Sequence, residues 1–235
     1  MSISSRRQKP RGRGFAVLFL LALSAKNHAA AFTTFTPTIS HGRSTSRCQA
    51  VKTDEELLPI VREEINERGF TEAWEACVDI LSKQDSMALS SREEAEILLS
   101  AALQWRGYAR VSSALARKYM KPREPNPQQL KTALDWLLVE GPLTAITSSW
   151  SPLELLQAVQ AAPTVYLVDP AKAYDDCLQS APKPYNTPET LLELVRDDPT
   201  ALLNNFNCAD IGCNSECGTC WVSYGIRRGK QVANF

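Results

Sequence analysis

Four cysteines near the end of the chain are the residues whose types and spacing could do chemistry. Cys208, Cys213, Cys217 and Cys220 follow the pattern C-x4-C-x3-C-x2-C in the stretch CADIGCNSECGTC. Zinc accepts four thiolates in a tetrahedron, and iron–sulfur clusters are also held by four cysteines. Glycines beside two of the thiols let backbone amides turn toward sulfur. The pattern therefore predicts a Cys₄ site for zinc or an iron–sulfur cluster.

The same thiols allow other outcomes. Two disulfide bonds could staple the tail, which is typical of oxidising compartments. Cys217 and Cys220 could form a redox-switchable dithiol, although a thioredoxin-type C-x-x-C follows a strand in a βαβ unit. The spacing matches neither ferredoxin pattern nor a paired zinc ribbon. Metal ligands, disulfides or redox thiols, and thiols without a special role stay open as alternatives.

The residues after the last cysteine combine aromatic and basic side chains. The stretch WVSYGIRRGKQVANF closes a Cys-rich C-terminal segment over residues 207–235, for which we expect a compact structure. We expect its aromatic and basic residues to lie against a partner protein, the alternative being a frayed terminus. These candidate partner-binding residues are Trp221, Tyr224, Arg227, Arg228 and Lys230.

Several enzyme classes are excluded by composition. Both histidines, His28 and His41, precede residue 51. The body of the chain therefore has no Ser-His or Cys-His nucleophile pair and no histidine metal ligand. It also has no GxGxxG, Walker or HExxH motif. These absences favour a non-enzymatic protein, without catalytic residues or a cofactor other than zinc or an iron–sulfur cluster.

Charge is unevenly distributed along the chain. The whole chain has 26 basic and 26 acidic residues, but residues 51–207 contain 24 acids and 15 bases, a net charge of 15 − 24 = −9. Affinity for a phosphate backbone comes from Lys and Arg, which release counterions from it. The acidic body therefore argues against a nucleic-acid partner.

The first 50 residues have the composition of a targeting sequence. A basic start precedes the apolar run FAVLFLLALSA and the small residues Ala29 and Ala31, which predicts a secretory signal peptide over residues 1–31. The run is shorter than the about 20 residues that a membrane span needs, which argues against an anchor helix. Residues 32–50 are rich in Ser and Thr and lack acids, as in a transit peptide.

Together these two parts resemble the bipartite presequence of algae with red-lineage secondary plastids, such as diatoms. The Phe at the junction, Phe32, is the most specific feature of the resemblance. It implies import into the plastid. Because no second apolar run follows, we expect the stroma or the stromal face of a thylakoid complex, and no transmembrane helix in the mature chain.

Residues 51–206 are predicted to form a row of short helices, and the chain an all-α fold. Apolar residues recur three and four positions apart, as in Leu130, Leu134, Leu137 and Leu138, and no alternating pattern suggests a sheet. We expect Cys77 to be a buried apolar residue and Trp74, Trp105 and Trp136 to be core residues. Helix starts are marked by Thr53–Glu56, Ser91–Glu94, Asn126-Pro127, Ser151–Glu154 and Thr187-Pro188.

The helical body contains an internal repeat. SPLELLQAVQAAPTVYL from Ser151 aligns without gaps on TPETLLELVRDDPTALL from Thr187. In each copy a cap and Pro start a helix, and a second Pro ends it before a short apolar turn. A weaker repeat relates Arg68-Gly69-Phe70 to Arg106-Gly107-Tyr108, and we expect each of them to lie between two helices. Stacked helix pairs predict an α-solenoid-like array of short helical hairpins.

The stretches ALDWLL (133–138), LLQAVQAAPTVYLVDP (155–170) and LLELVRDDPTALL (191–203) are similar to repeats of the mitochondrial transcription termination factor (mTERF) family. The resemblance implies an α-solenoid and a nucleic-acid role in organellar gene expression. That role needs a basic concave groove, whereas the body of this chain is acidic. If such a groove exists, removing Arg110, Arg117 and Lys118 should abolish RNA or DNA binding.

The sequence leaves three classes of function. The first is a non-enzymatic plastid scaffold that binds other proteins, as an accessory or assembly subunit of a thylakoid or photosystem complex on its stromal side. The second is an mTERF-like gene-expression factor that binds nucleic acid. The third is a Cys₄ metal or thiol redox protein.

Overall fold

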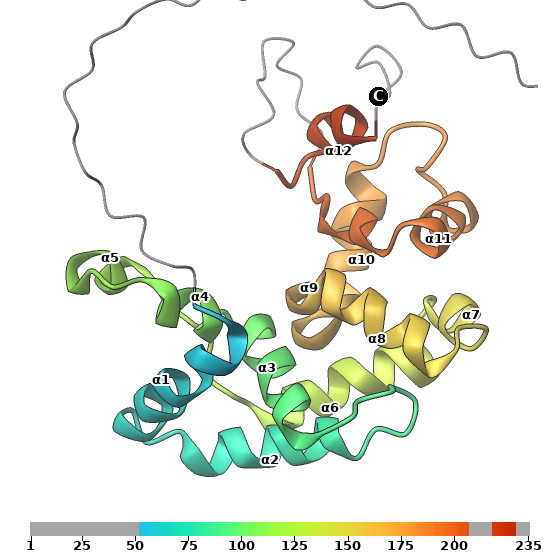
Figure 1. The fold of residues 1–235 in the computed structure, drawn as a ribbon. Coiled ribbons are helices and arrows are strands. Elements are labelled where there is room, and N and C mark those ends of the chain that lie inside the picture. Colours follow the sequence, from blue (N-terminus) through green and yellow to red (C-terminus); the bar gives the residue numbers. More distant parts are fainter. Residues whose placement is uncertain (1–51, 207–217, 229–235) are drawn as a thin grey trace, which may run out of the picture. The chain divides into compact units, whose positions relative to one another are not determined.

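The computed structural model describes residues 52–206 and 218–228 (Figure 1). These residues form α-helices, one π-helix and one 3₁₀-helix, and no strand, which confirms the all-α class. The first half contains α1 (Asp54–Glu67), α2 (Thr71–Ser82), α3 (Arg92–Ala102), α4 (Trp105–Arg110), α5 (Ala114–Tyr119), α6 (Pro127–Asp135) and the π-helix η1 (Trp136–Glu140). The second half contains α7 (Thr144–Thr147), α8 (Pro152–Ala161), α9 (Pro163–Val168), α10 (Pro170–Ser180), α11 (Pro188–Asp197), the 3₁₀-helix η2 (Pro199–Leu203) and α12 (Trp221–Arg227).

All five predicted helix starts are confirmed. Thr53, Ser151 and Thr187 each form a complete capping box, in which the cap side chain and the third helical residue exchange hydrogen bonds with backbone N–H groups. Ser91 accepts from the backbone N–H of Glu94, and Asn126 accepts from those of residues 128 and 129. These local bonds satisfy donors that the first turn of a helix leaves without partners.

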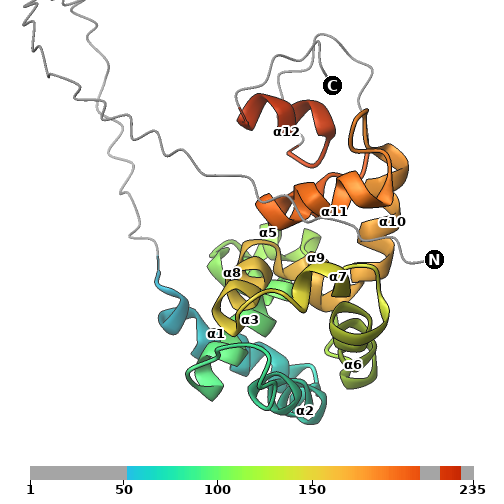
Figure 2. The ribbon, with the colours of Figure 1, turned by 90° about the vertical axis from the view of Figure 1, so that its right-hand side faces the viewer.

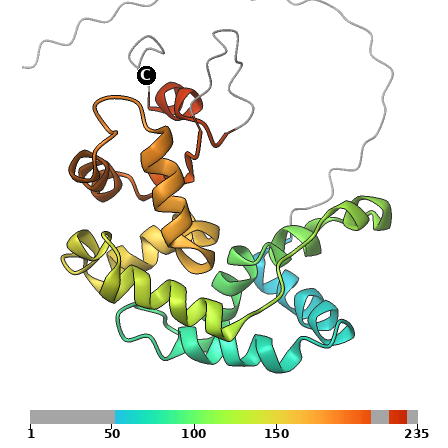
Figure 3. The same ribbon diagram turned by 180° about the vertical axis from the view of Figure 1, so that it is seen from behind.

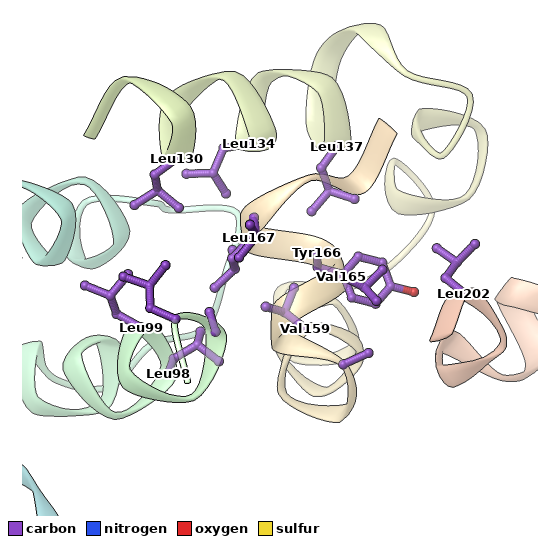
Figure 4. Close-up of a cluster of buried hydrophobic side chains, with 14 of the residues drawn as sticks. Leu98, Leu99, Leu130, Leu134, Leu137, Val159, Val165, Tyr166, Leu167 and Leu202 are labelled. Carbon is purple, nitrogen blue, oxygen red and sulfur yellow. The ribbon is translucent and has the colours of Figure 1, made fainter. Parts of the chain in front are cut away.

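The hydrophobic core is built around α9. Val165, Tyr166, Leu167 and Val168 are all buried, and α9 packs against α3, α6, α8 and α10. Figure 4 shows leucines of α6 and η1 above these side chains and Leu98 and Leu99 of α3 below them. The helical spacing of the leucines at 130, 134 and 137 therefore serves this central contact.

The two copies of the repeat have the same local design. In each, a capped helix that starts with Pro is followed by a second Pro that starts a further helix, α9 in one copy and η2 in the other. The second Pro thus begins a helix instead of the expected apolar turn. The copies touch each other, since η2 packs on α8 and the Tyr166 hydroxyl donates to the Pro199 carbonyl at 2.9 Å.

The solenoid arrangement is not confirmed. A solenoid unit contacts only its neighbours in sequence, whereas α9 packs on α3 across several intervening helices. The expectation that Arg106-Gly107-Tyr108 lies between two helices was also wrong, because these residues lie within α4. The chain turns at Gln104, whose φ of 68° is left-handed, while the earlier copy turns at Gly69, with φ 75°.

Trp74 and Trp105 are buried core residues, as expected, while Trp136 is partly buried beside Gly141. A Cβ on Gly141 would lie 2.5 Å from the Trp136 ring and from its carbonyl oxygen, so this position needs glycine. Among the residues that the structure describes, no helix is long and apolar enough to cross a membrane.

Candidate functional site

Only one of the four clustered cysteines lies in the described part of the chain. Cys208, Cys213 and Cys217 lie outside it, so the predicted metal or disulfide site stays a prediction. Cys220 is buried and caps α12, with its sulfur accepting from the backbone N–H of Ser223 at 3.3 Å. Phe206 and Cys220 form a parallel bridge, in which the Trp221 N–H donates to the Phe206 carbonyl at 3.1 Å. This bridge holds together the two ends of the cysteine-containing stretch.

Two of the predicted partner-binding residues of the tail, Trp221 and Tyr224, fasten α12 to this same chain. Trp221 is fully buried, donates from its indole to Ser180 at 3.0 Å and stacks on Tyr185. Tyr224 is also buried and donates to Asp198 at 3.0 Å. The two rings are therefore covered by this same chain, because α12 uses them to pack beside α10 and the start of η2 (Figure 2), and their role in partner binding stays a prediction.

The basic residues of the tail have different places. Arg228 pairs with Asp198 at 3.4 Å and keeps 43% of its side chain exposed. Arg227 is the last residue of α12, and its side chain is outside the described part, as is Lys230. A role of these three residues in partner binding stays a prediction.

A more open site lies on the α5 arm, defined here as residues 111–123. Helix α5 buries none of its six residues, and Leu115 and Tyr119 are 68% and 77% exposed. Figure 3 shows the arm extending beyond α4, and the arm ends at Arg123. There the Arg123 N–H donates to the Leu103 carbonyl at 2.9 Å, and the Trp105 indole donates to the Arg123 carbonyl at 2.8 Å. The arm is thus an exposed element with a firmly held base.

A cavity of about 460 Å³ opens between this arm and the end of α1. We call it the basic cavity, because its charged lining consists of Arg68, Arg117 and Lys118. The other lining residues are Tyr108, Ser112, Ala114 and Met120.

Stacking and ion pairing position the two arginines of the basic cavity. The guanidinium of Arg68 lies 4.9 Å from the centre of the Tyr108 ring, and that of Arg117 lies 5.4 Å from it. Both also pair with the carboxylate of Glu64, Arg117 at 3.2 Å and Arg68 at 3.6 Å. Cation–π contact and a shared carboxylate restrict the side chains while leaving excess positive charge.

Of the three basic residues that were expected in a nucleic-acid groove, the fold brings two together. Arg117 and Lys118 line the basic cavity, whereas Arg110 lies outside its lining and shares Asp54 with Arg106, at 3.0 and 2.9 Å. The contributions of Arg68 and Tyr108, and the exposure of Leu115 and Tyr119, were missed. One sequence signal was available: the stretch 97–123 contains six bases and no acid, within an otherwise acidic body.

Comparison with known proteins adds no relative. No protein-family model, no curated protein and no solved structure matches this chain.

Proposed function

We propose that this chain is a non-enzymatic helical scaffold that binds another protein through its α5 arm. The main support for this proposal is the exposure of Leu115 and Tyr119 on a helix that buries none of its residues. Isolated helices this short are unstable in water, because nucleation is unfavourable and little is gained by propagation. Exposed apolar side chains four positions apart lie on the same side of a helix and offer a partner one contiguous surface.

The host assembly is proposed from the presequence. Its resemblance to red-lineage plastid presequences supports a location in the stroma or on the stromal face of a thylakoid. We therefore propose an accessory or assembly subunit of a thylakoid complex, such as a photosystem. The acidic composition of the body supports a protein partner over the nucleic acid implied by the mTERF resemblance.

The test is the migration of the full chain from gently solubilised plastids on a native gel. We expect the wild type to run with a larger complex and a Leu115→Ser/Tyr119→Ser variant to run at the size of the free protein. A matched control is Val139→Ser/Leu153→Ser, since both residues are exposed apolar side chains elsewhere, at 72% and 55%. The proposal fails if the wild type runs alone, or if the arm variant and the control behave alike.

A second proposal concerns the cysteines. We propose that Cys208, Cys213, Cys217 and Cys220 form a structural Cys₄ metal site or two disulfides, with the bridge of Phe206 and Cys220 supporting a closed segment. Elemental analysis for zinc and iron, with alkylation in denaturant before and after reduction, separates the two. Bound metal supports the first form, and thiols that appear only after reduction support the second. Alkylation of all four of these cysteines in denaturant without reduction, in a protein that holds no metal, would contradict both.

A further inference from the structure

We propose that the basic cavity binds a carboxylate side chain of an acidic peptide segment, beside an apolar residue of that segment held by Leu115 and Tyr119. This inference rests on the proposed scaffold function and names the chemistry of the partner. It commits the site to a protein ligand that carries an acidic residue next to a large apolar one.

The charge balance of the basic cavity supports an anionic group. Arg68, Arg117 and Lys118 bring three positive charges, and no acidic side chain is among the lining residues. Glu64 is shared by the two arginines, and Lys118 has no ion pair among the described residues. One carboxylate cannot neutralise three cations, so the site keeps a net attraction for a further anion.

The donors of the basic cavity are arranged before a ligand arrives. Besides Glu64, Arg117 donates from Nε to the Val111 carbonyl at 2.5 Å, while Arg68 also lies 4.8 Å from the Trp105 ring centre. A guanidinium carries five N–H donors, so each arginine keeps donors for a ligand after these contacts. Restricting the planar groups lowers the entropy lost on binding a carboxylate.

Apolar residues in the lining of the basic cavity and elsewhere on α5 favour a peptide. Met120 lines the cavity and packs over Gly107, and Leu115 and Tyr119 lie on the same short helix. A nucleic acid would need many spaced phosphate contacts, whereas this site offers three cations in one concavity. A lipid surface would need a helix with a broad apolar face, whereas the six residues of α5 offer only Leu115 and Tyr119 as exposed large apolar side chains.

The direct test uses the full chain and a fluorescent peptide in which Glu and Leu alternate. Fluorescence anisotropy should show saturable binding that weakens with salt. Lys118→Glu should weaken it about tenfold, because a rim cation becomes a like charge. Lys131→Glu is the matched control: the same charge change at an exposed residue of α6 should leave the affinity within about twofold.

Other ligands are tested as competitors. Oligothymidylate and phosphatidylglycerol vesicles should not displace the peptide. The proposal is overturned if the peptide does not bind, if Lys118→Glu and Lys131→Glu act alike, or if nucleic acid or vesicles bind the wild type while the peptide does not.

The native gel separates this inference from the proposed function. Loss of the complex with both Leu115→Ser/Tyr119→Ser and Lys118→Glu supports both proposals. If the apolar variant loses the complex and Lys118→Glu keeps it at every salt concentration, the scaffold function stands and the acidic ligand is wrong. If neither variant loses it, both proposals fall.

Discussion

At the scale of single residues, Glu96 is the most consequential charge in the core. It lies on α3 with 6% of its side chain exposed. It accepts hydrogen bonds from the Trp74 indole at 3.0 Å and from Nε of Arg62 at 2.9 Å. Burial alone would raise the pKa of Glu96, but the bonds from Arg62 and Trp74 and the charge of Arg62 lower it overall. Helices α1, α2 and α3 therefore share one ionised carboxylate.

We predict that Glu96→Gln lowers the free energy of unfolding at neutral pH by about 1–3 kcal/mol, because the partners lose a charged acceptor. The pKa of Glu96 in the folded protein lies below the usual 4.5. Its contribution to the free energy of unfolding is therefore complete at pH values above 4.5 and is lost as the pH falls through the folded-state pKa. Denaturant titrations across this range should show a shallower acid dependence in the variant. Glu93→Gln, at an exposed position of the same helix, serves as control, and equal effects of both variants would contradict the assignment.

Cys77 and Cys177 are predicted to be unreactive in the folded protein. Burial raises the pKa of Cys77 to about 11, against a weaker opposing hydrogen bond from the backbone of Asn126, and raises that of Cys177 to about 12. The thiolate is the reactive form, and it is scarce at any pH well below these values. Iodoacetamide at mildly alkaline pH, followed by peptide mass spectrometry, should label both only in denaturant. Labelling of the native chain at the rate of an exposed thiol would refute this.

At the scale of elements, the sequence predicts where helices start but not which residues they pack against. Thr53 and Ser151 were predicted correctly because a capping box is complete within four consecutive residues, and Thr187 because a Pro follows the cap directly. The turn at Gln104 carries no such signal, since its left-handed backbone is imposed by packing between α3 and α4. The basic cavity was visible in the sequence only as a basic stretch, because Arg68, which stacks on Tyr108, comes from the end of α1, much earlier in the chain.

The exposure of the α5 arm predicts its dynamics. Backbone amides of α5 should exchange with deuterium faster than those of α9, because α5 buries none of its residues and all of the last four residues of α9 are buried. Hydrogen exchange with mass spectrometry on the free full chain provides this comparison. The acidic peptide should then slow exchange in α5 and leave α9 unchanged. Equal protection of the two helices in the free protein would show that the arm is not a weakly held element.

At the scale of the whole described chain, the C-terminal helix is part of the fold. Trp221 and Tyr224 were expected to lie against a partner, because aromatic residues near a terminus give no indication of which surface covers them. Their contacts reach Ser180 and Asp198, which are far away in sequence and lie on α10 and at the start of η2. Such long-range pairs depend on how the helices stack, and a single sequence does not encode them in a local pattern.

Asp198 is the residue through which this fastening can be tested. Its carboxylate caps η2 by accepting from the backbone N–H of Thr200 at 3.0 Å, and it also holds the Tyr224 hydroxyl and Arg228. We predict that Asp198→Ala lowers the free energy of unfolding by about 1–3 kcal/mol, whereas Asp197→Ala at the exposed neighbouring position changes it little. Tyr224→Phe removes one of the same bonds, so its effect should be smaller in the Asp198→Ala background than in the wild type. Additive effects in this double-mutant cycle, measured by denaturant unfolding, would show that α12 is not held to the body through Asp198.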